Sequence, residues 1–299
     1  MRPPVRYRVR HLTRYVYEGQ VAHAHQVLHL TPRVTERQRS FGHSILVNPA
    51  AMLREDHLDA FGNGVTRLEL DRPHGALDII ATMEVEISAL ADIDPTRSEN
   101  WEANRAALQY RALDQTPAQL DVLRYAGGSA YVPIKRMFED YAREAFAPDT
   151  PVLVGAEALM AKIHREFEYA PGATEIATPL VEVFTERKGV CQDYAHLMIA
   201  CLRSLGLAAR YVSGYLRTHT GADDSKLTGS DASHAWVSIW APPFGWVDLD
   251  PTNNLRVDRD HVVLAWGRDF GDVSPLRGVL LGGGSHTLEV GVAVTPLAA

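Results

Sequence analysis

Two segments of the sequence carry residue types that together could perform nucleophilic catalysis, and the first is centred on a cysteine. Cys191 lies in Lys-Gly-Val-Cys-Gln-Asp-Tyr-Ala-His, residues 188–196, at the start of a stretch with helical periodicity. Apolar residues recur at helical spacing over residues 190–205, and Gly206 can provide a left-handed cap. Unpaired N–H groups and the positive end of the helix dipole stabilise a thiolate in a first helical turn. Because the thiolate is the nucleophilic form, the position favours a reactive Cys191, whereas Cys201 on the apolar face fits a buried structural role.

The second segment places a histidine and an aspartate on one face of an expected β-hairpin. Residues 234–240 read His-Ala-Trp-Val-Ser-Ile-Trp and alternate as a strand, and residues 245–250 form a second strand. With a loop of residues 241–243, His234 lies directly opposite Asp250 on the same face. Directly opposite residues are close enough for a hydrogen bond between the carboxylate and the imidazole.

The three side chains suggest a nucleophile, a base and an acid that orients the base. In this hypothesis, His234 withdraws the proton of the Cys191 thiol, and Asp250 fixes the imidazole tautomer. Asp248 shares the face of Asp250 and is the rival for the orienting role, and a slip of one residue in the hairpin would exclude Asp250.

The surrounding sequence divides into a β-rich part and a mixed part. Residues 1–95 contain short alternating runs separated by Pro and Gly turn signals, which is typical of a β-sandwich-like domain. After Pro95, helical patterns prevail up to the cysteine helix, and strands follow that helix. The order predicts an α+β protein with a β-rich N-terminal domain, residues 1–95. The helical segment and the catalytic core then occupy residues 96–299.

Charge and composition argue against several classes of protein. The 299 residues include 30 Lys and Arg against 37 Asp and Glu, a formal net charge of −7. Nucleic-acid binding needs a basic face, and anionic membranes attract polybasic segments, so neither partner is expected. No apolar run reaches the ~20 residues of a membrane span, and the first ten residues lack the apolar core of a signal peptide. With two cysteines and no disulfide pattern, we expect a cytoplasmic protein without a cofactor.

Other histidines near these segments have simpler interpretations. His23 and His25 could both face one side of a strand as metal ligands, but no third ligand stands at a recognisable spacing, so no metal site is predicted. His196 lies five residues after Cys191, and residues five apart on a helix do not face each other, so packing is favoured. Asp193 fits as a favourable charge in the first helical turn.

Aromatic residues and a long loop accompany His234. The loop of residues 218–233 is rich in Thr, Gly, Asp and Ser, and it could be a lid over the site or simply a mobile loop. Tryptophans of the hairpin could wall a substrate cleft or pack in the core, and both interpretations remain open. These tryptophans are Trp236, Trp240 and Trp246.

The motifs around these residues resemble the bacterial transglutaminase-like superfamily. The similarity extends to the N-terminal region of that bacterial group and to a C-terminal segment, so it covers almost the whole chain. The segments that carry it are residues 189–197, 205–215, 231–236, 245–253, 265–278, 11–17 and 30–33.

The resemblance implies a papain-like, transglutaminase-like core in which the catalytic helix packs on an antiparallel sheet. The motif positions of the family correspond to Cys191, His234 and Asp250. Acyl-enzyme chemistry also needs an oxyanion hole, for which the backbone N–H of Cys191 is one donor. Tyr169 is the candidate for the second donor, and Gln192 is the weaker alternative because it points elsewhere on the helix.

The expected activity is cysteine-dependent acyl transfer on amide bonds of a peptide or protein substrate. Hydrolysis is favoured, as in a protease or isopeptidase-like amidase. Transfer to a lysine or small amine, as in a protein-glutamine transglutaminase, is one alternative, and a catalytically silent protein-binding scaffold is another. The oligomeric state is left open.

Overall fold

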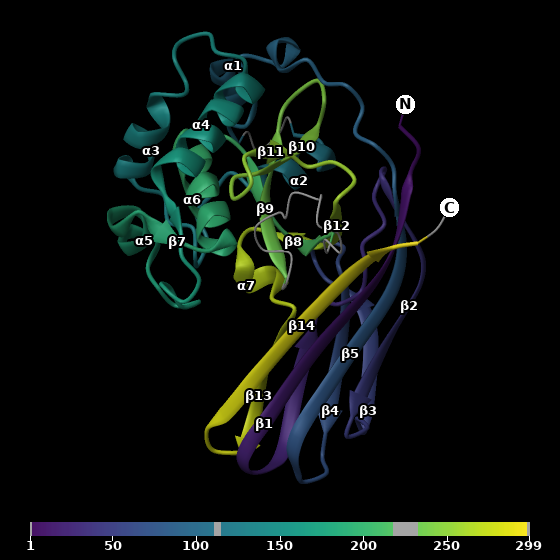
Figure 1. Ribbon diagram of the computed structural model, residues 1–299. Helices are drawn as coiled ribbons and strands as arrows, with labels where there is room; N and C mark the ends of the chain where they lie inside the picture. Colours follow the sequence, from purple (N-terminus) through teal and green to yellow (C-terminus); the bar gives the residue numbers. More distant parts are fainter. Residues whose placement is uncertain (1, 111–114, 218–232, 298–299) are drawn as a thin grey trace.

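The computed structural model describes residues 2–110, 115–217 and 233–297, and its most extended part is a curled antiparallel sheet (Figure 1). Its strand order is β2-β5-β1-β4-β3, and β13 and β14 also pair with β1. The strands are β1 (Val5–Leu28), β2 (Gln38–Asn48), β3 (Leu53–Leu58), β4 (Gly64–Leu70), β5 (His74–Ile87), β13 (Leu276–Gly282) and β14 (His286–Pro296).

The curl arises because the two halves of β1 have different neighbours. Residues 7–16 of β1 pair with both β5 and β14, whereas residues 24–28 pair with both β4 and β13. The register with β5 shifts between Val16 and Val21, which lie on either side of the bend. Inward-facing apolar side chains of the curled sheet, such as Leu28, are fully buried. The expected β-sandwich-like domain is therefore one sheet curled on itself.

Both ends of the chain contribute to this sheet. β14 runs antiparallel beside the first half of β1, and the two termini lie near each other in Figure 1. The division of the chain into residues 1–95 and 96–299 stays a prediction. The strand pairing adds that residues 276–296 join the sheet formed by the first part of the chain.

A second antiparallel sheet and a set of helices form the other half of the molecule. The sheet has the order β11-β10-β9-β8-β12. Its strands are β8 (Ala209–Leu216), β9 (His234–Trp240), β10 (Trp246–Asp250), β11 (Leu255–Arg256) and β12 (His261–Gly267). The helices are η1 (Pro95–Arg97), α1 (Trp101–Ala107), α2 (Pro117–Leu123), α3 (Arg136–Arg143), α4 (Val152–Glu166), α5 (Leu180–Glu186), α6 (Cys191–Ser204) and α7 (Phe270–Val273). A short parallel pair, β6 (Glu168–Tyr169) and β7 (Lys188–Gly189), precedes α6.

Helix α6 is the central helix of this half and packs against β9 as well as against α3, α4 and α5 (Figure 1). The alternate residues Ala235, Val237 and Ile239 of β9 belong to the same buried cluster as the apolar residues of α6. The helix begins at Cys191, and Gly206 follows it with a φ of 82°, as the sequence predicts for a left-handed cap. The expected papain-like and transglutaminase-like arrangement of one helix on an antiparallel sheet is therefore confirmed.

Polar side chains join the two sheets. β12 is an edge strand that pairs with β8 on one side only, and its backbone is irregular between Val263 and Ala265. At Val263, the Gln38 side-chain amide takes the place of a neighbouring strand. Gln38 Nε2 donates to the Val263 carbonyl at 2.7 Å, and Gln38 Oε1 accepts from the Val263 N–H at 2.8 Å. The Tyr215 hydroxyl of β8 lies 2.8 Å from Nδ1 of His11 in β1. The curled sheet is thus attached to the core through paired buried groups.

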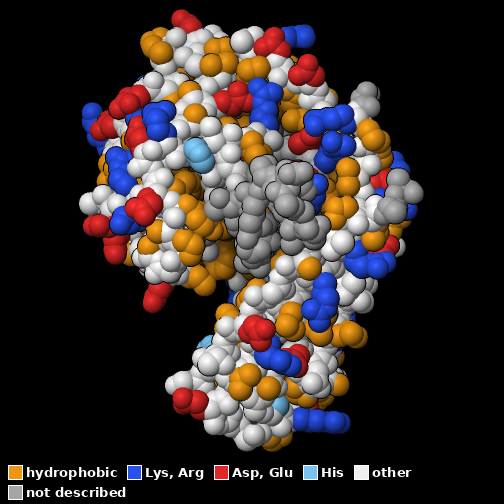
Figure 2. All heavy atoms as spheres, in the orientation of Figure 1, with side chains coloured by type: hydrophobic (Ala, Val, Ile, Leu, Met, Phe, Trp, Pro, Cys, Tyr) orange, Lys and Arg blue, Asp and Glu red, His pale blue; other side chains and the backbone are white. Residues whose placement is uncertain are grey.

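Within the described ranges, no helix is long and apolar enough to span a membrane. Acidic and basic side chains are interspersed over the face shown in Figure 2. The absence of nucleic-acid and membrane partners stays a prediction.

Gly214 in β8 provides a test of the core sheet. A Cβ atom at this position would clash with the Val262 carbonyl oxygen and would lie 2.5 Å from the Trp236 ring. We expect Gly214→Ala to lower the free energy of unfolding by about 1–3 kcal/mol, because the clash is with backbone and a buried ring. Urea denaturation followed by circular dichroism measures this change.

Gly42 is the matched control for this substitution, because it also lies in a strand but a Cβ atom there would meet no atom within 4 Å. Gly42→Ala should change the free energy of unfolding by less than about 0.5 kcal/mol. Equal effects of the two substitutions would contradict the close packing of β8 against β12.

Candidate active site

The first turn of α6 holds Cys191 in a fixed position. Asp193 Oδ2 accepts a hydrogen bond from the Val190 N–H at 2.8 Å and from the Thr174 hydroxyl at 2.6 Å. A Cβ atom at Gly189 would lie 2.7 Å from Asp193, so the residue two positions before Cys191 must be small. Burial raises the pKa of Asp193. Asp193 therefore closes the helix start by hydrogen bonding, in addition to the favourable charge in the first helical turn that the sequence suggests.

The two cysteines lie in different environments, and both are free thiols. Cys201 is fully buried in the core, and burial raises the pKa of its thiol. Cys191 is only partly buried and is the first residue of α6. Only Cys191 is placed to meet a substrate.

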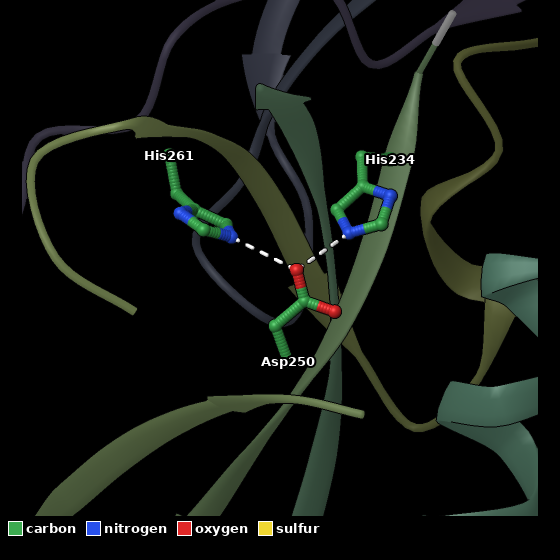
Figure 3. Close-up of side chains that lie close together, drawn as sticks. All are labelled: His234, Asp250 and His261. Atoms are coloured by element: carbon green, nitrogen blue, oxygen red, sulfur yellow. Dashed lines mark hydrogen bonds and ion pairs between the residues drawn. The ribbon is translucent and has the colours of Figure 1, made fainter. Parts of the chain in front are cut away.

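His234 and Asp250 are in direct contact and fully buried. His234 Nε2 lies 2.9 Å from Asp250 Oδ2, and the relative exposure of both side chains is 0 % (Figure 3). Because the pKa of Asp250 is lowered, the carboxylate is ionised and His234 Nε2–H is the donor. Asp250 therefore fixes the tautomer of His234 and leaves Nδ1 as the second reactive nitrogen.

The hairpin register that the sequence suggests is wrong by two residues, yet the predicted contact forms. The paired positions are Trp246 with Trp240 and Leu249 with Val237, so the loop is longer than residues 241–243. Asp250 is consequently diagonal to His234 rather than directly opposite. A shift of two residues keeps the same face, because side chains alternate with a period of two. The side chains then meet across the diagonal.

The Asp250 carboxylate accepts at least five hydrogen bonds from the described residues. Oδ1 accepts from the backbone N–H groups of Thr252 and Asn253, at 3.0 and 3.2 Å. Oδ2 accepts from Asn253 Nδ2 at 2.8 Å and from two histidines. Burial raises the pKa of Asp250, but the charges and hydrogen bonds of His234 and His261 outweigh it and lower the pKa.

The second histidine, His261, is absent from the sequence-based prediction. His261 Nε2 lies 3.1 Å from Asp250 Oδ2 (Figure 3). The residue is buried beside the Trp236 ring. His261 begins β12, which is three strands away from β10 in the sheet order. No local spacing in the sequence indicates this contact, because it depends on the path of β12 past Gly214, which carries no side chain between β9 and β12.

Among the described residues, His234, Asp250 and His261 form a group of potential metal ligands whose ligand atoms lie within 4.8 Å of one another. The contacts of 2.9 and 3.1 Å between Nε2 and Oδ2 are hydrogen bonds, in which each Nε2 carries a proton. A metal ion would have to displace both protons. The geometry is therefore that of a carboxylate held by two imidazoles.

Cys191 lies beside His234. Burial lowers the pKa of His234, but the Asp250 charge and hydrogen bond raise it more, and the nearby Cys191 raises it further. His234 Nδ1 makes no hydrogen bond of normal geometry to any described residue. Nδ1 is thus the nitrogen left to exchange a proton with the thiol. The arrangement can form a thiolate and imidazolium pair.

Tyr169 lies close to Cys191, as the oxyanion hypothesis requires. Its strand β6 pairs in parallel with β7, and Tyr169 is the partner of Gly189. Burial, followed by the charge of Cys191, raises the pKa of Tyr169 to about 12. The hydroxyl therefore keeps its proton and can donate a hydrogen bond.

Other candidates lie away from this cluster. Asp248 Oδ2 accepts from Trp236 Nε1 at 3.1 Å instead of from His234. His196 is buried, stacks on Tyr131 and accepts from the Phe270 N–H at 3.1 Å, so packing is confirmed. Gln192 is partly exposed. The expected loop of residues 218–233 lies, except for its last residue, outside the described residues.

Comparisons with known proteins agree with this fold. Residues 139–251 match the model of the transglutaminase-like superfamily, and residues 7–86 match the bacterial transglutaminase-like N-terminal region. An uncharacterized protein of Mycobacterium tuberculosis is 36% identical over 97% of this chain and 93% of its own length. A second, from Mycobacterium leprae, is 32% identical over 98% of this chain and 99% of its own length. The chain belongs to the transglutaminase-like superfamily and carries its bacterial N-terminal region.

Two further relatives differ in what their names describe. A Pseudomonas aeruginosa protein-glutamine gamma-glutamyltransferase is 31% identical over 42% of this chain but only 19% of the enzyme. The crystal structure of a Cytophaga hutchinsonii protein, provisionally named a cysteine protease, superposes with a TM-score of 0.76. It covers 100% of this chain and 92% of that one at 21% identity, which establishes a shared fold.

The pairing of His234 with Asp250 makes stability depend on pH. The folded-state pKa of His234 is raised to about 10, so its contribution is complete below about pH 6.5, the ordinary value, and is lost as the pH rises toward 10. The pKa of Asp250 is lowered, so its contribution is complete above about pH 4 and is lost as the pH falls. Asp250→Asn should therefore cost about 3–5 kcal/mol between about pH 4 and pH 6.5, and less at about pH 9 or pH 2.5.

Urea denaturation of both proteins across this pH range measures the difference. Asp248→Asn is the control and should show no such maximum, because Asp248 has a tryptophan rather than a histidine as its partner. A loss that stays constant with pH for Asp250→Asn would contradict the ionic pairing.

Proposed function

We propose that this protein catalyses cysteine-dependent acyl transfer on amide bonds of peptides or proteins, with Cys191, His234 and Asp250 as the catalytic triad. The single observation that carries the proposal is the buried His234–Asp250 pair with Nδ1 left open beside Cys191. A structural histidine pair would have no need of a partly exposed thiol at a helix start. Family membership supports the same chemistry.

The proposed reaction proceeds through a thioester. The raised pKa of His234 favours a thiolate and imidazolium pair, in which His234 Nδ1 holds the thiol proton. The Cys191 thiolate then attacks the amide carbonyl carbon. The Cys191 N–H and the Tyr169 hydroxyl are the proposed donors to the oxyanion. The C–N bond then breaks, and the leaving amine takes the proton from His234. Asp250 stays ionised throughout and stabilises the imidazolium.

Hydrolysis of the thioester is the favoured outcome. Water needs only an open site, whereas transamidation needs a site that binds an amine and shields the thioester from water. The 4 lysines of the chain also make it a poor acceptor for itself. The Pseudomonas aeruginosa relative is named a transglutaminase, which makes transamidation the second candidate.

The remaining functional expectations form part of the same proposal. The substrate is a peptide or protein, and no cofactor takes part. A cytoplasmic, reducing location is consistent with two free cysteines. A catalytically silent scaffold is the alternative that the variants below test.

The reactivity of the two cysteines should differ strongly. We expect iodoacetamide near neutral pH to alkylate Cys191 and to leave Cys201 unmodified, because Cys201 is fully buried. Peptide mass spectrometry measures both sites, and Cys191→Ala is the control for assignment.

Asp250→Asn should lower the turnover of an accepted peptide by about 10⁴, the scale known for a triad acid made neutral.

Asp248→Asn should change turnover far less than Asp250→Asn. The reverse ranking would move the orienting role to Asp248.

Equal alkylation of both cysteines would contradict the proposed nucleophile. If Cys191→Ala leaves every measured activity unchanged, the scaffold alternative replaces both enzyme hypotheses.

The fate of the acyl group separates a hydrolase from a transglutaminase. A peptide library provides one accepted substrate, and mass spectrometry identifies its products with and without a primary amine at about 10 mM, well above typical KM values. We expect the free acid as the main product in both cases, because water reaches the open thioester. If most of the product carries the amine, transamidation is the activity.

A further inference from the structure

A cavity of about 560 Å³ lies on the face of the core sheet that is opposite α6. Residues 35–38 and parts of the segment 87–93 line it from the side of the curled sheet. Its volume is within the range of small-molecule sites. The side chains that matter for its chemistry are Arg37, Arg210, Trp240, Trp246, Asp248 and Trp266.

Arg210 of β8 is the unusual group in this cavity. Its residue is only 8 % exposed. The guanidinium carbon lies 4.3 Å from the centre of the Trp246 ring and 3.7 Å from the centre of the Trp266 ring. Burial lowers the pKa of Arg210 only to about 10, so the group stays charged near neutral pH.

Stacking leaves Nε of the Arg210 guanidinium without a hydrogen-bond partner. The N–H groups of a guanidinium lie in its plane, so aromatic rings above and below cannot accept them along their bonds. Nε is buried without a partner, and no described residue accepts a hydrogen bond from Arg210 or forms an ion pair with it. A buried cation without an acceptor is costly. The edge of the Arg210 guanidinium therefore needs a hydrogen-bond acceptor in the cavity.

Three carboxylates line this cavity, those of Glu36, Asp248 and Asp258. The charge of Asp248 partly offsets the effect of burial on the pKa of Arg210, but none of the three forms a hydrogen bond or an ion pair with Arg210. In the strand register, Ser238 of β9 is the partner of both Arg210 in β8 and Asp248 in β10. The backbones of Arg210 and Asp248 are consequently separated by two strand spacings, about 9–10 Å. Asp248 is already bonded to Trp236 Nε1. Arg37 is bonded in turn to Asp258 and to backbone carbonyls.

We propose that this cavity binds a small organic carboxylate with an apolar body, whose carboxylate accepts hydrogen bonds from the edge of Arg210. The tryptophans provide apolar walls for the body of the ligand. A single cation without a hydrogen-bonded carboxylate suits a monoanion, because the charges of Glu36 and Asp248 in the lining oppose a doubly charged group such as phosphate. His261, which bonds Asp250, also lines the cavity, but binding there does not require catalysis by Cys191.

Binding of three probes tests the proposal with the full chain. The probes are 3-phenylpropionate, its neutral analogue 3-phenylpropanol, and inorganic phosphate. Tryptophan fluorescence and calorimetry measure the dissociation constants. We expect saturable binding of 3-phenylpropionate and at least about tenfold weaker binding of the other two, as one charge-assisted hydrogen bond predicts.

Matched variants assign the effect to Arg210. Arg210→Met should weaken binding of 3-phenylpropionate at least about tenfold, and Arg210→Lys, which keeps the charge but loses the planar fork, should weaken it less. Arg33→Met is the control, because Arg33 stacks 3.5 Å from the centre of the same Trp266 ring and does not line the cavity. It should bind as the wild type does. Circular dichroism confirms that each variant is folded.

The proposal is overturned by any of four results. These are no binding of 3-phenylpropionate below about 10 mM, equal binding of the alcohol, tighter binding of phosphate, or equal losses in the Arg210 and Arg33 variants. The last result would mean that the stacked arginines only hold the tryptophans together. If Arg210→Met does not fold, the ranking of the three probes and Arg210→Lys decide the question.

Discussion

A buried carboxylate is stable only when hydrogen-bond donors replace the water that it loses, and Asp250 is the residue where this requirement is strictest. Its donors come from β9, from β12 and from the turn after β10. The turn and two strands must therefore all be in place before the charge can be buried. The position of His234, and with it the geometry beside Cys191, follows from how this one charge is satisfied.

The curled sheet supports the same requirement from a distance. His261 can reach Asp250 only if β12 follows its observed path, and the irregular backbone of β12 at Val263 is completed by Gln38. Gln38 belongs to β2, so the N-terminal region provides a hydrogen-bond partner for the strand that carries His261. The N-terminal region is thus part of the support of the candidate site.

The sequence predicts most of what depends on local periodicity. The helix start at Cys191 and the shared face of His234 and Asp250 depend on spacings of a few residues, and the two-residue error in register left that face unchanged. Contacts between distant segments could not be predicted in this way. His261 meets Asp250 across several strands, and Arg210 lies between tryptophans of two other strands. Such contacts depend on sheet order and curvature, which periodicity does not determine.

The pairing of β1 with β13 and β14 has a consequence for biosynthesis. The ribosome releases β1 well before β13 and β14, so one edge of β1 has no partner while residues 29–275 are made. Domains generally fold as units during synthesis, and unpaired strand edges promote aggregation. The curled sheet closes only after residues 276–296 have been made. A chain truncated before residue 276 would contain every residue of the candidate triad and still expose an open β-edge, which marks it for quality control.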